Sequence, residues 1–180
     1  MKLKMSRQEF LSRWRALRGY APLRNDVSLS RSDGLDFDAR LEAEMDGWYR
    51  RLVLEGDESL LAPEELAPGV SLSAPADGCV TLTLPPHAAR VTGVRLSGWR
   101  RVATVVTDPE CNLALRQLHP YTRACEANPV AIVYPDGEMA LYPACESDRL
   151  VSLRCAMMRD NEFAFDSAAL ALTDDVMNCE

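Results

Sequence analysis

Cysteine and histidine side chains in the middle of this chain have residue types that can do chemistry. Cys111, His119 and Cys125 are near one another in the sequence, and Cys145 follows. Four such ligands can hold zinc in a tetrahedral site. Their spacing fits no familiar zinc finger, however. A simpler interpretation is that Cys111, Leu115 and Leu118 lie on the buried face of a short helix, because unpaired cysteine is among the most buried residue types.

A second arrangement of the same residues would be enzymatic. Cys125 could act as a nucleophile, with His119 as its base and Asp136 orienting that base. Nothing in the sequence brings these three residues together, and His119 before Pro120 is better explained as a turn residue. The common phosphate-loop, dinucleotide, nucleophile-elbow and zinc-protease motifs are also missing. We therefore predict no catalytic, metal or cofactor site. A Cys/His enzyme stays as a third functional hypothesis, ranked after the two that are given at the end of this subsection.

Composition and charge predict one folded domain with an appended arm. The chain has 180 residues, of which 47% are hydrophobic and 26% charged, which is typical of soluble domains. Its net charge of -7 is uneven, because basic residues crowd the start: Lys2, Lys4, Arg7, Arg13, Arg15, Arg18 and Arg24. Such a basic arm suits an acidic partner or a phosphate backbone, although a solvated helix face is the simpler interpretation. The acidic remainder argues against wrapping nucleic acid.

The cysteines and the first residues indicate where the protein is made. Six cysteines occur without a Cys-x-x-Cys pair, and residues 1–5 lack the apolar run of a signal peptide. No stretch approaches the roughly 20 apolar residues that span a bilayer. We expect reduced thiols, no membrane partner and a protein that is cytosolic when made.

Two helices are expected before the β structure. Ser6 and Glu9 form a Ser-x-x-Glu capping box, and the apolar face that follows ends at Gly19. A second helical stripe is formed by Leu41, Met45, Trp48 and Leu52, and it ends before Gly56.

From Cys79 onward the apolar period changes from helical to strand-like. Strands are predicted at 80–84, 90–96, 102–106, 130–134, 138–142 and 150–157, with a bulge at Gly93 and a hairpin turn at Pro135-Asp136-Gly137. Asp108 and Asp166 are expected to cap two short helices.

These elements predict an α+β fold, in which N-terminal helices precede a mainly antiparallel β core, a sandwich or barrel-like, with short interspersed helices. We expect three segments: a basic amphipathic helical arm over 1–24, a linker and helical segment over 25–75, and a β core with short helices over 76–180.

Aromatic and arginine side chains stand beside one another at two places, Trp48-Tyr49-Arg50-Arg51 and Trp99-Arg100-Arg101. Trp, Tyr and Arg dominate binding hot spots. The alternative is that the rings are core and only the arginines are exposed. The candidate interface residues are Arg13, Trp14, Trp48, Tyr49, Arg50, Arg51, Trp99, Arg100, Arg101, Tyr121 and Arg123.

Several short motifs follow one another in a fixed order after the Trp48-Tyr49 pair: Thr81–Pro85, Arg90–Leu96, Gly98–Arg101, Pro120–Arg123, Asn128–Ala131 and Met139–Pro143. Their order resembles that of the head-to-tail connector, or neck ring, proteins of tailed bacteriophages, above all the short-tailed and crAss-like phages. The resemblance runs over roughly residues 40 to 172, and in that family a Trp-Tyr pair precedes the β core.

The resemblance implies a structural virion protein without an active site. Such a protein forms a ring, typically of twelve copies, below the portal in the portal-tail neck, and contacts the portal and neighbouring neck or tail proteins. DNA only passes through its lumen, and the host cytoplasm is where it is assembled. The alternative hypothesis is a stand-alone cytosolic protein-binding module with no virion role.

Overall fold

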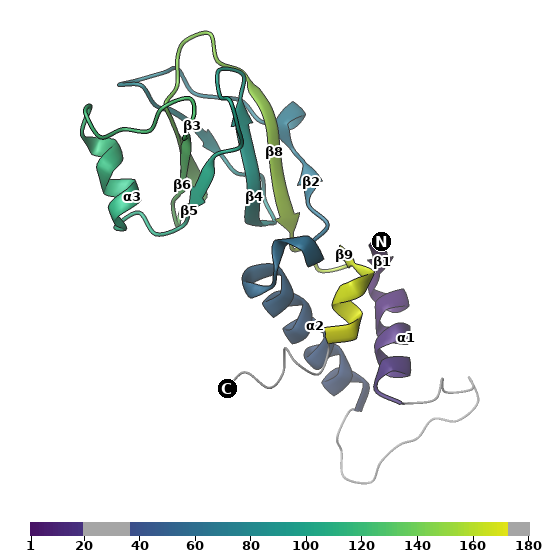
Figure 1. The fold of residues 1–180 in the computed structure, drawn as a ribbon. Helices are drawn as coiled ribbons and strands as arrows, with labels where there is room; N and C mark the ends of the chain where they lie inside the picture. Colours follow the sequence, from purple (N-terminus) through teal and green to yellow (C-terminus); the bar gives the residue numbers. More distant parts are fainter. Residues whose placement is uncertain (20–36, 173–180) are drawn as a thin grey trace. The chain divides into compact units, whose positions relative to one another are not determined.

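The computed structural model describes residues 1–19 and 37–172 and divides the chain into two compact units (Figure 1). The first unit combines Met1–Ala62 with Met158–Glu180, and the second unit is Pro63–Met157. The fold is α+β, as predicted, with N-terminal helices followed by mainly antiparallel sheets and short helices. The division differs from the three expected segments, because the chain after Met157 returns to the N-terminal unit.

The described residues of the first unit form two α-helices, a two-stranded ribbon and two short 3-10 helices. They are β1 (Lys2–Ser6), α1 (Arg7–Leu17), α2 (Phe37–Glu55), η1 (Glu58–Leu60), β9 (Glu162–Asp166) and η4 (Ser167–Leu172). The capping box is confirmed, because the Ser6 hydroxyl accepts from the Glu9 amide and the Glu9 carboxylate accepts from the Ser6 amide. Gly19, at φ +74°, follows the end of α1, as expected of a glycine stop.

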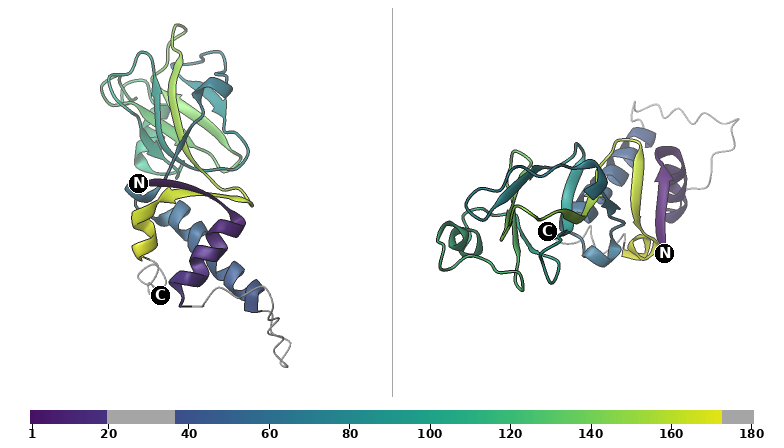
Figure 2. Two further views of the ribbon diagram at one scale, coloured as in Figure 1. Left: turned by 90° about the vertical axis from the view of Figure 1, so that its right-hand side faces the viewer. Right: turned by 90° about the horizontal axis from the view of Figure 1, so that it is seen from above.

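The ribbon pairs the two ends of the described chain. β1 and β9 are antiparallel, with Leu3 opposite Phe165 and Met5 opposite Phe163. Neither strand was predicted from the sequence. Both helices lie on the same side of this ribbon (Figure 2), and the ring centroids of Phe10 and Phe163 are 4.9 Å apart.

An aromatic cluster forms the core of the first unit. Its six buried rings belong to α1, α2 and β9: Phe10, Trp14, Trp48, Tyr49, Phe163 and Phe165. Neighbouring centroids are 4.9 to 6.2 Å apart in tilted or edge-to-face arrangements, which suit the ring quadrupoles. The Tyr49 hydroxyl also accepts from the Ala164 amide at 3.2 Å. The aromatic residues on the apolar faces of both helices are therefore covered from within the same chain, while Leu17 at the end of α1 is 47% exposed.

The basic residues of α1 are largely neutralised by α2, which modifies the expectation of a basic arm. Arg15 Nη2 is 2.7 Å from Asp38 Oδ1, and Arg18 pairs with Glu44. Arg7 contacts both Asp46 and Glu42 of α2, and the pKa of Arg7 is raised, most strongly by its hydrogen bond to Asp46. The described part of the expected arm is thus half of a packed helix pair. Residues 20–24 of that arm, and much of the expected linker, lie outside the described residues.

The second unit contains two sheets and the connections between them. Its elements are β2 (Glu64–Glu65), η2 (Ala67–Gly69), β3 (Val80–Thr83), β4 (Ala88–Leu96), β5 (Thr104–Val106), α3 (Asn112–Leu115), η3 (Arg116–Leu118), β6 (Val130–Val133), β7 (Glu138–Tyr142) and β8 (Leu150–Met157). One sheet has the order β2-β8-β4 and the other β3-β7-β6-β5. All pairs are antiparallel except β5 and β6, which run parallel.

One hydrophobic core joins the two sheets of the second unit. It includes Leu82 of β3, Val94 of β4, Leu141 of β7 and Leu153 of β8. Trp99 is buried in the same core, and its indole nitrogen donates to the Pro143 carbonyl at 2.7 Å. Burial on both inner faces explains why the strand periods could be recognised in the sequence.

Local predictions in the second unit are mostly confirmed. The β4 register shifts between Val91 and Gly93, where the bulge was expected. Gly137 has φ +85° in the β6–β7 turn, and the Asp136 carboxylate accepts from the Glu138 amide at 3.0 Å. In the first unit, Asp166 accepts from the Ala168 amide at 3.0 Å at the start of η4, as its predicted capping role requires.

One cap prediction is wrong. Asp108 accepts from the Glu110 amide within a turn, and α3 begins later, with Cys111 at its N-cap position. An Asp side chain can satisfy a turn two residues on as readily as a helix start, so Asp108 alone did not fix the boundary.

Candidate interaction surface

The aromatic residues proposed as interface anchors form the cores of the two units. Trp14, Trp48 and Tyr49 are buried in the first unit, and Trp99 is buried in the second. These rings hold the units together, so in this structure their faces are not available to a partner. The alternative prediction, that these rings belong to the core, is confirmed for all four of them.

The predicted arginines differ more from one another. Arg13, Arg50, Arg100 and Arg101 are exposed, and Arg51 is partly exposed. Arg101 donates to the Asn128 side chain. Arg13, Arg50 and Arg51 belong to the first unit, and Arg100 and Arg101 belong to the second.

Arg123 has a different role, because it holds a loop in place. Its Nε donates to the Gln117 carbonyl at 2.8 Å, and its Nη1 donates to the Asp77 carbonyl. The Thr122 hydroxyl donates to the Arg116 carbonyl at 2.7 Å. Residues 111–125, which contain α3 and η3, are thereby bonded to themselves and to the turn at Asp77.

A buried glutamine completes this network. Gln117 is 2% exposed, and apart from aromatic and cysteine residues it is the only buried polar side chain in the described chain. Its Nε2 donates to the Leu113 carbonyl and its Oε1 accepts from the Ala124 amide, both at 2.8 Å. A buried polar group with satisfied donors and acceptors fixes one conformation of the chain around it. Gln117 was not recognised from the sequence, where a lone glutamine carries no signal.

The segment so fixed exposes three large side chains, which we call the loop surface: Leu115, Leu118 and Tyr121. Their exposed fractions are 45%, 66% and 102%. The expected buried face of Cys111, Leu115 and Leu118 is therefore wrong for the two leucines; Cys111 is partly buried. The physical reason is that Ala114 and Gln117, not the leucines, are the buried residues of this segment: Ala114 packs with Val130 and Ile132.

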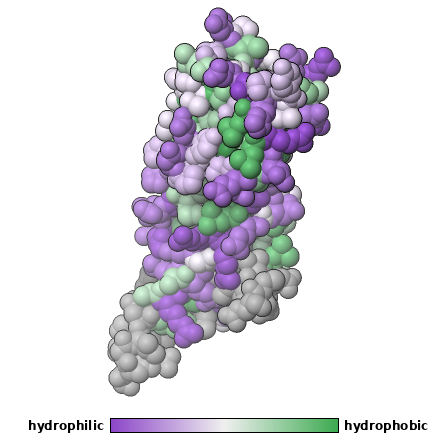
Figure 3. Space-filling view, turned by 90° about the vertical axis from the view of Figure 1, so that its left-hand side faces the viewer, coloured by the Kyte–Doolittle hydropathy of each residue, from purple (hydrophilic) through white to green (hydrophobic). Residues whose placement is uncertain are grey.

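The loop surface lies on the outside of the second unit. Figure 1 shows α3 beside β5 and β6, outside the sheets. Figure 3 views the molecule from the side on which α3 lies and shows apolar atoms standing among hydrophilic ones. Of the predicted interface residues, Tyr121 is the one whose whole side chain projects from this surface.

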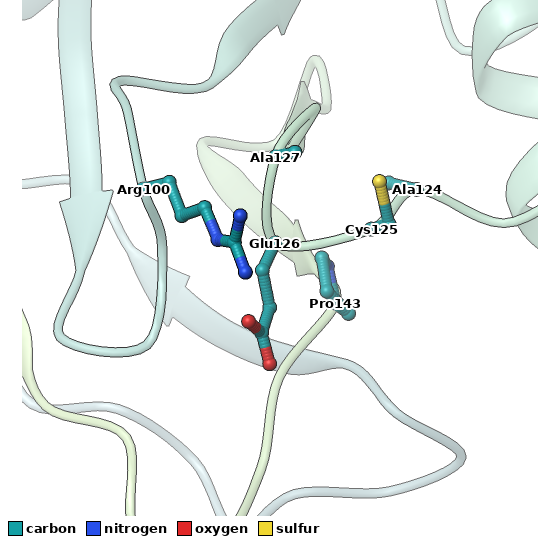
Figure 4. Close-up of a pocket in the computed structure, with 6 residues that line it drawn as sticks. All are labelled: Arg100, Ala124, Cys125, Glu126, Ala127 and Pro143. Carbon is teal, nitrogen blue, oxygen red and sulfur yellow. The ribbon is translucent and has the colours of Figure 1, made fainter.

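A shallow hollow of about 450 Å³ lies near the other end of the same loop. Arg100 and Glu126 extend their side chains into it, while the Cys125 sulfur points away from both end groups (Figure 4). The Arg100 amide donates to the Glu126 carbonyl at 3.0 Å. The hollow is open to solvent, and Cys125 is exposed at its rim.

The cysteine and histidine hypotheses receive no geometric support in the described residues. Among them, no group of three or more His, Cys, Asp and Glu side chains is arranged to hold a metal ion. His119 lies in a turn, where its carbonyl accepts from the Thr122 amide, and Asp136 lies in the β6–β7 turn. Burial raises the pKa of Cys155 to about 12 and also raises that of Cys79, so both thiols stay protonated at neutral pH.

In the part of the chain that the structure describes, no helix is both long enough and apolar enough to cross a bilayer. Compared with known proteins, the chain matches no protein-family model and no curated sequence.

Proposed function

We propose that this chain is a structural protein that assembles with copies of itself into a ring in the portal-tail neck of a tailed phage. The order of motifs over residues 40 to 172 supports this function, and the loop surface is the structural observation that carries it. Leucine and tyrosine side chains exposed within one short segment are typical of a surface that becomes buried in an assembly.

The rigidity of the loop surface adds to this argument. Gln117 and Arg123 hold the segment through hydrogen bonds at 2.8 Å, so little conformational freedom remains to be lost on binding. A fixed surface binds more tightly than a mobile one of equal area, because the ordering entropy has already been lost on folding. Exposure of three apolar side chains to water is unfavourable, and this cost is recovered when a partner buries them.

The net charge agrees with a ring through which DNA passes. At -7 the chain is repelled by phosphate, so packaged DNA would not adhere to a lumen lined by its acidic residues. No partner beyond the chain itself, the portal and neighbouring neck or tail proteins is needed for this function.

A stand-alone binding module is the second candidate, because the loop surface would serve an unrelated protein partner equally well. The two functions differ in self-association. The chain should be mixed with purified portal rings encoded by the same genome, and the products examined by negative-stain electron microscopy. Rings of this chain seated on the portal support the proposal. A chain that remains monomeric and does not bind the portal contradicts it and favours the module.

A further inference from the structure

We propose that the loop surface of one copy binds an acidic turn, residues 54–58, of the next copy, so that the two contacts of each subunit are different and propagate around a ring. This inference rests on the proposed function and names the surfaces that would carry it. Two properties of the described residues, exposed apolar area and charge, lead to this pairing, and the symmetry of a contact between identical copies is the third argument.

The loop surface is apolar and basic. Residues 111–125 contain Arg116 and Arg123 but no Asp or Glu, although the whole chain is acidic. Arg116 and His119 are exposed between Leu115, Leu118 and Tyr121, whereas Arg123 is engaged with backbone carbonyls. A complementary partner therefore offers apolar area next to negative charge.

The acidic turn has these two properties. It begins in the last turn of α2, where Leu54 is 43% exposed and Glu55 is exposed, and it continues through the exposed Asp57 to the exposed Glu58 of η1. Residues 54–58 contain no Lys or Arg. Arg50 and Arg51 lie one turn earlier on the helix, and Lys2 Nζ donates to the Ser59 carbonyl at 2.9 Å directly after the turn. Its shape is fixed, because the Asp57 carboxylate accepts from the Ser59 amide at 2.8 Å and the Gly56 amide donates to the Leu52 carbonyl at 3.0 Å.

Charge disfavours the simplest alternative contact. A two-fold dimer through the loop surface would bring two basic loops into one contact, and residues 111–125 contain no carboxylate that could oppose Arg116. A contact between two different surfaces avoids this repulsion. Such head-to-tail contacts close into a ring when the rotation between copies allows it.

Charge reversal tests the pairing of the two surfaces. R116E alone would place a carboxylate against Glu55 of the next copy, and E55R alone would place a guanidinium against Arg116. Each variant should weaken self-association on portal rings by about tenfold or more, because juxtaposed like charges are strongly unfavourable. In an equal mixture, every contact between the two variants pairs opposite charges, so a ring in which they alternate has attraction at every contact. The double variant R116E/E55R also restores attraction at every contact of the ring.

The readout is the mass distribution of chain assembled on purified portal rings, measured by mass photometry. R95E is the matched control, because Arg95 is exposed on β4, away from the loop surface in the sequence. The expected result is assembly by the wild type, the R95E control, the double variant and the equal mixture, and loss of assembly by each single variant alone.

Three other results would overturn the inference, and only the last of them would also reject the ring function. If R116E and E55R each form rings as the wild type does, the proposed contact is wrong while the ring function stands. Rings lost in the single variants and not recovered in the double variant show that Arg116 and Glu55 do not meet. A wild type that neither self-associates nor binds the portal rejects the contact and the ring function together. Circular dichroism of each variant confirms that it is folded.

Discussion

At the scale of single residues, Gln117 connects the fold of the second unit to the surface that we propose as functional. It is buried, it bonds to Leu113 and Ala124, and its own carbonyl accepts from Arg123. The segment that Gln117 fixes carries the exposed side chains of Leu115, Leu118 and Tyr121. The side chain is therefore structural, and its effect on binding is indirect.

Gln117→Ala should release this loop. The change leaves the Ala124 amide and Leu113 carbonyl without their partner, which destabilises the folded segment by about 1–3 kcal/mol. Hydrogen exchange followed by mass spectrometry should show faster exchange of peptides covering residues 111–125 and unchanged exchange in β8. Arg116→Ala is the control, because its exposed side chain holds nothing in the network. Equal protection in wild type and Gln117→Ala would show that the loop does not depend on the glutamine.

Glu65 predicts the pH dependence of the second unit. Burial alone would raise its pKa, but hydrogen bonds from the Ser152 hydroxyl and from the Leu153 and Ala67 amides outweigh burial and lower it below the usual 4.5. The unfolded chain therefore takes up this proton at higher pH than the folded chain does. The stabilisation is complete above the unfolded pKa and is lost as the pH falls through the folded pKa.

The urea midpoint of the second unit should accordingly fall as the pH drops below the usual pKa of 4.5, and Glu65→Gln should flatten that part of the profile. Glutamine keeps one acceptor oxygen but cannot be protonated in this range. The measurement is the denaturation midpoint at several pH values, followed by Trp99 fluorescence in a chain with Trp14 and Trp48 replaced by Phe. Identical slopes for this chain with and without Glu65→Gln would contradict the role of the carboxylate.

At the scale of elements, the β1–β9 ribbon makes the first unit discontinuous in sequence. Phe165 of β9 lies 5.2 Å from Phe10 and 5.5 Å from Trp48 between ring centroids, so a C-terminal strand completes a core begun by α1 and α2. Leu61 also bridges to Phe165. The unit is therefore complete only when both ends of the described chain are present.

Phe165→Ala should destabilise the first unit by about 3–5 kcal/mol, as expected for removal of a fully buried ring. Hydrogen exchange should accelerate in α1 and α2 and remain unchanged in β4, β7 and β8 of the second unit. Leu172→Ala is a control in the same unit, because Leu172 is exposed. If hydrogen exchange accelerated equally in both units, Phe165 would not belong to a core that is confined to the first unit.

Elements with a strong periodic pattern were predictable from the sequence, and those with a short or interrupted pattern were not. Helix α2 and the β6–β7 hairpin follow from the Leu41 to Leu52 stripe and from the turn at Gly137. The β1 strand has only five residues, and its alternation of Lys2 and Lys4 with Leu3 and Met5 was not read as a strand. Its pairing with β9 is a contact between the chain ends, which no local pattern encodes.

The candidate surface was predictable only in part, for a related reason. Tyr121 was among the predicted interface residues because of its type, and it is fully exposed. Leu115 and Leu118 were assigned to a buried face, since apolar residues at helical spacing usually pack inward. Whether Ala114 or the two leucines face inward depends on how α3 packs against the sheet, which is a tertiary contact that the local sequence does not encode.

At the scale of the whole molecule, the chain has two units with their own cores and with surfaces of unlike properties. The second unit presents an apolar and basic loop, and the first unit presents an acidic turn. Unlike surfaces on one chain are the requirement for head-to-tail assembly. The mass of the assembled particle is therefore the property that most directly reflects the proposed function.

The most direct test of the ring proposal is the mass of the complex formed when the purified chain meets portal rings encoded by the same genome, determined by native mass spectrometry. We predict one discrete species in which a fixed number of chains has joined each portal ring. A portal ring of unchanged mass beside a monomeric chain would contradict the proposed ring.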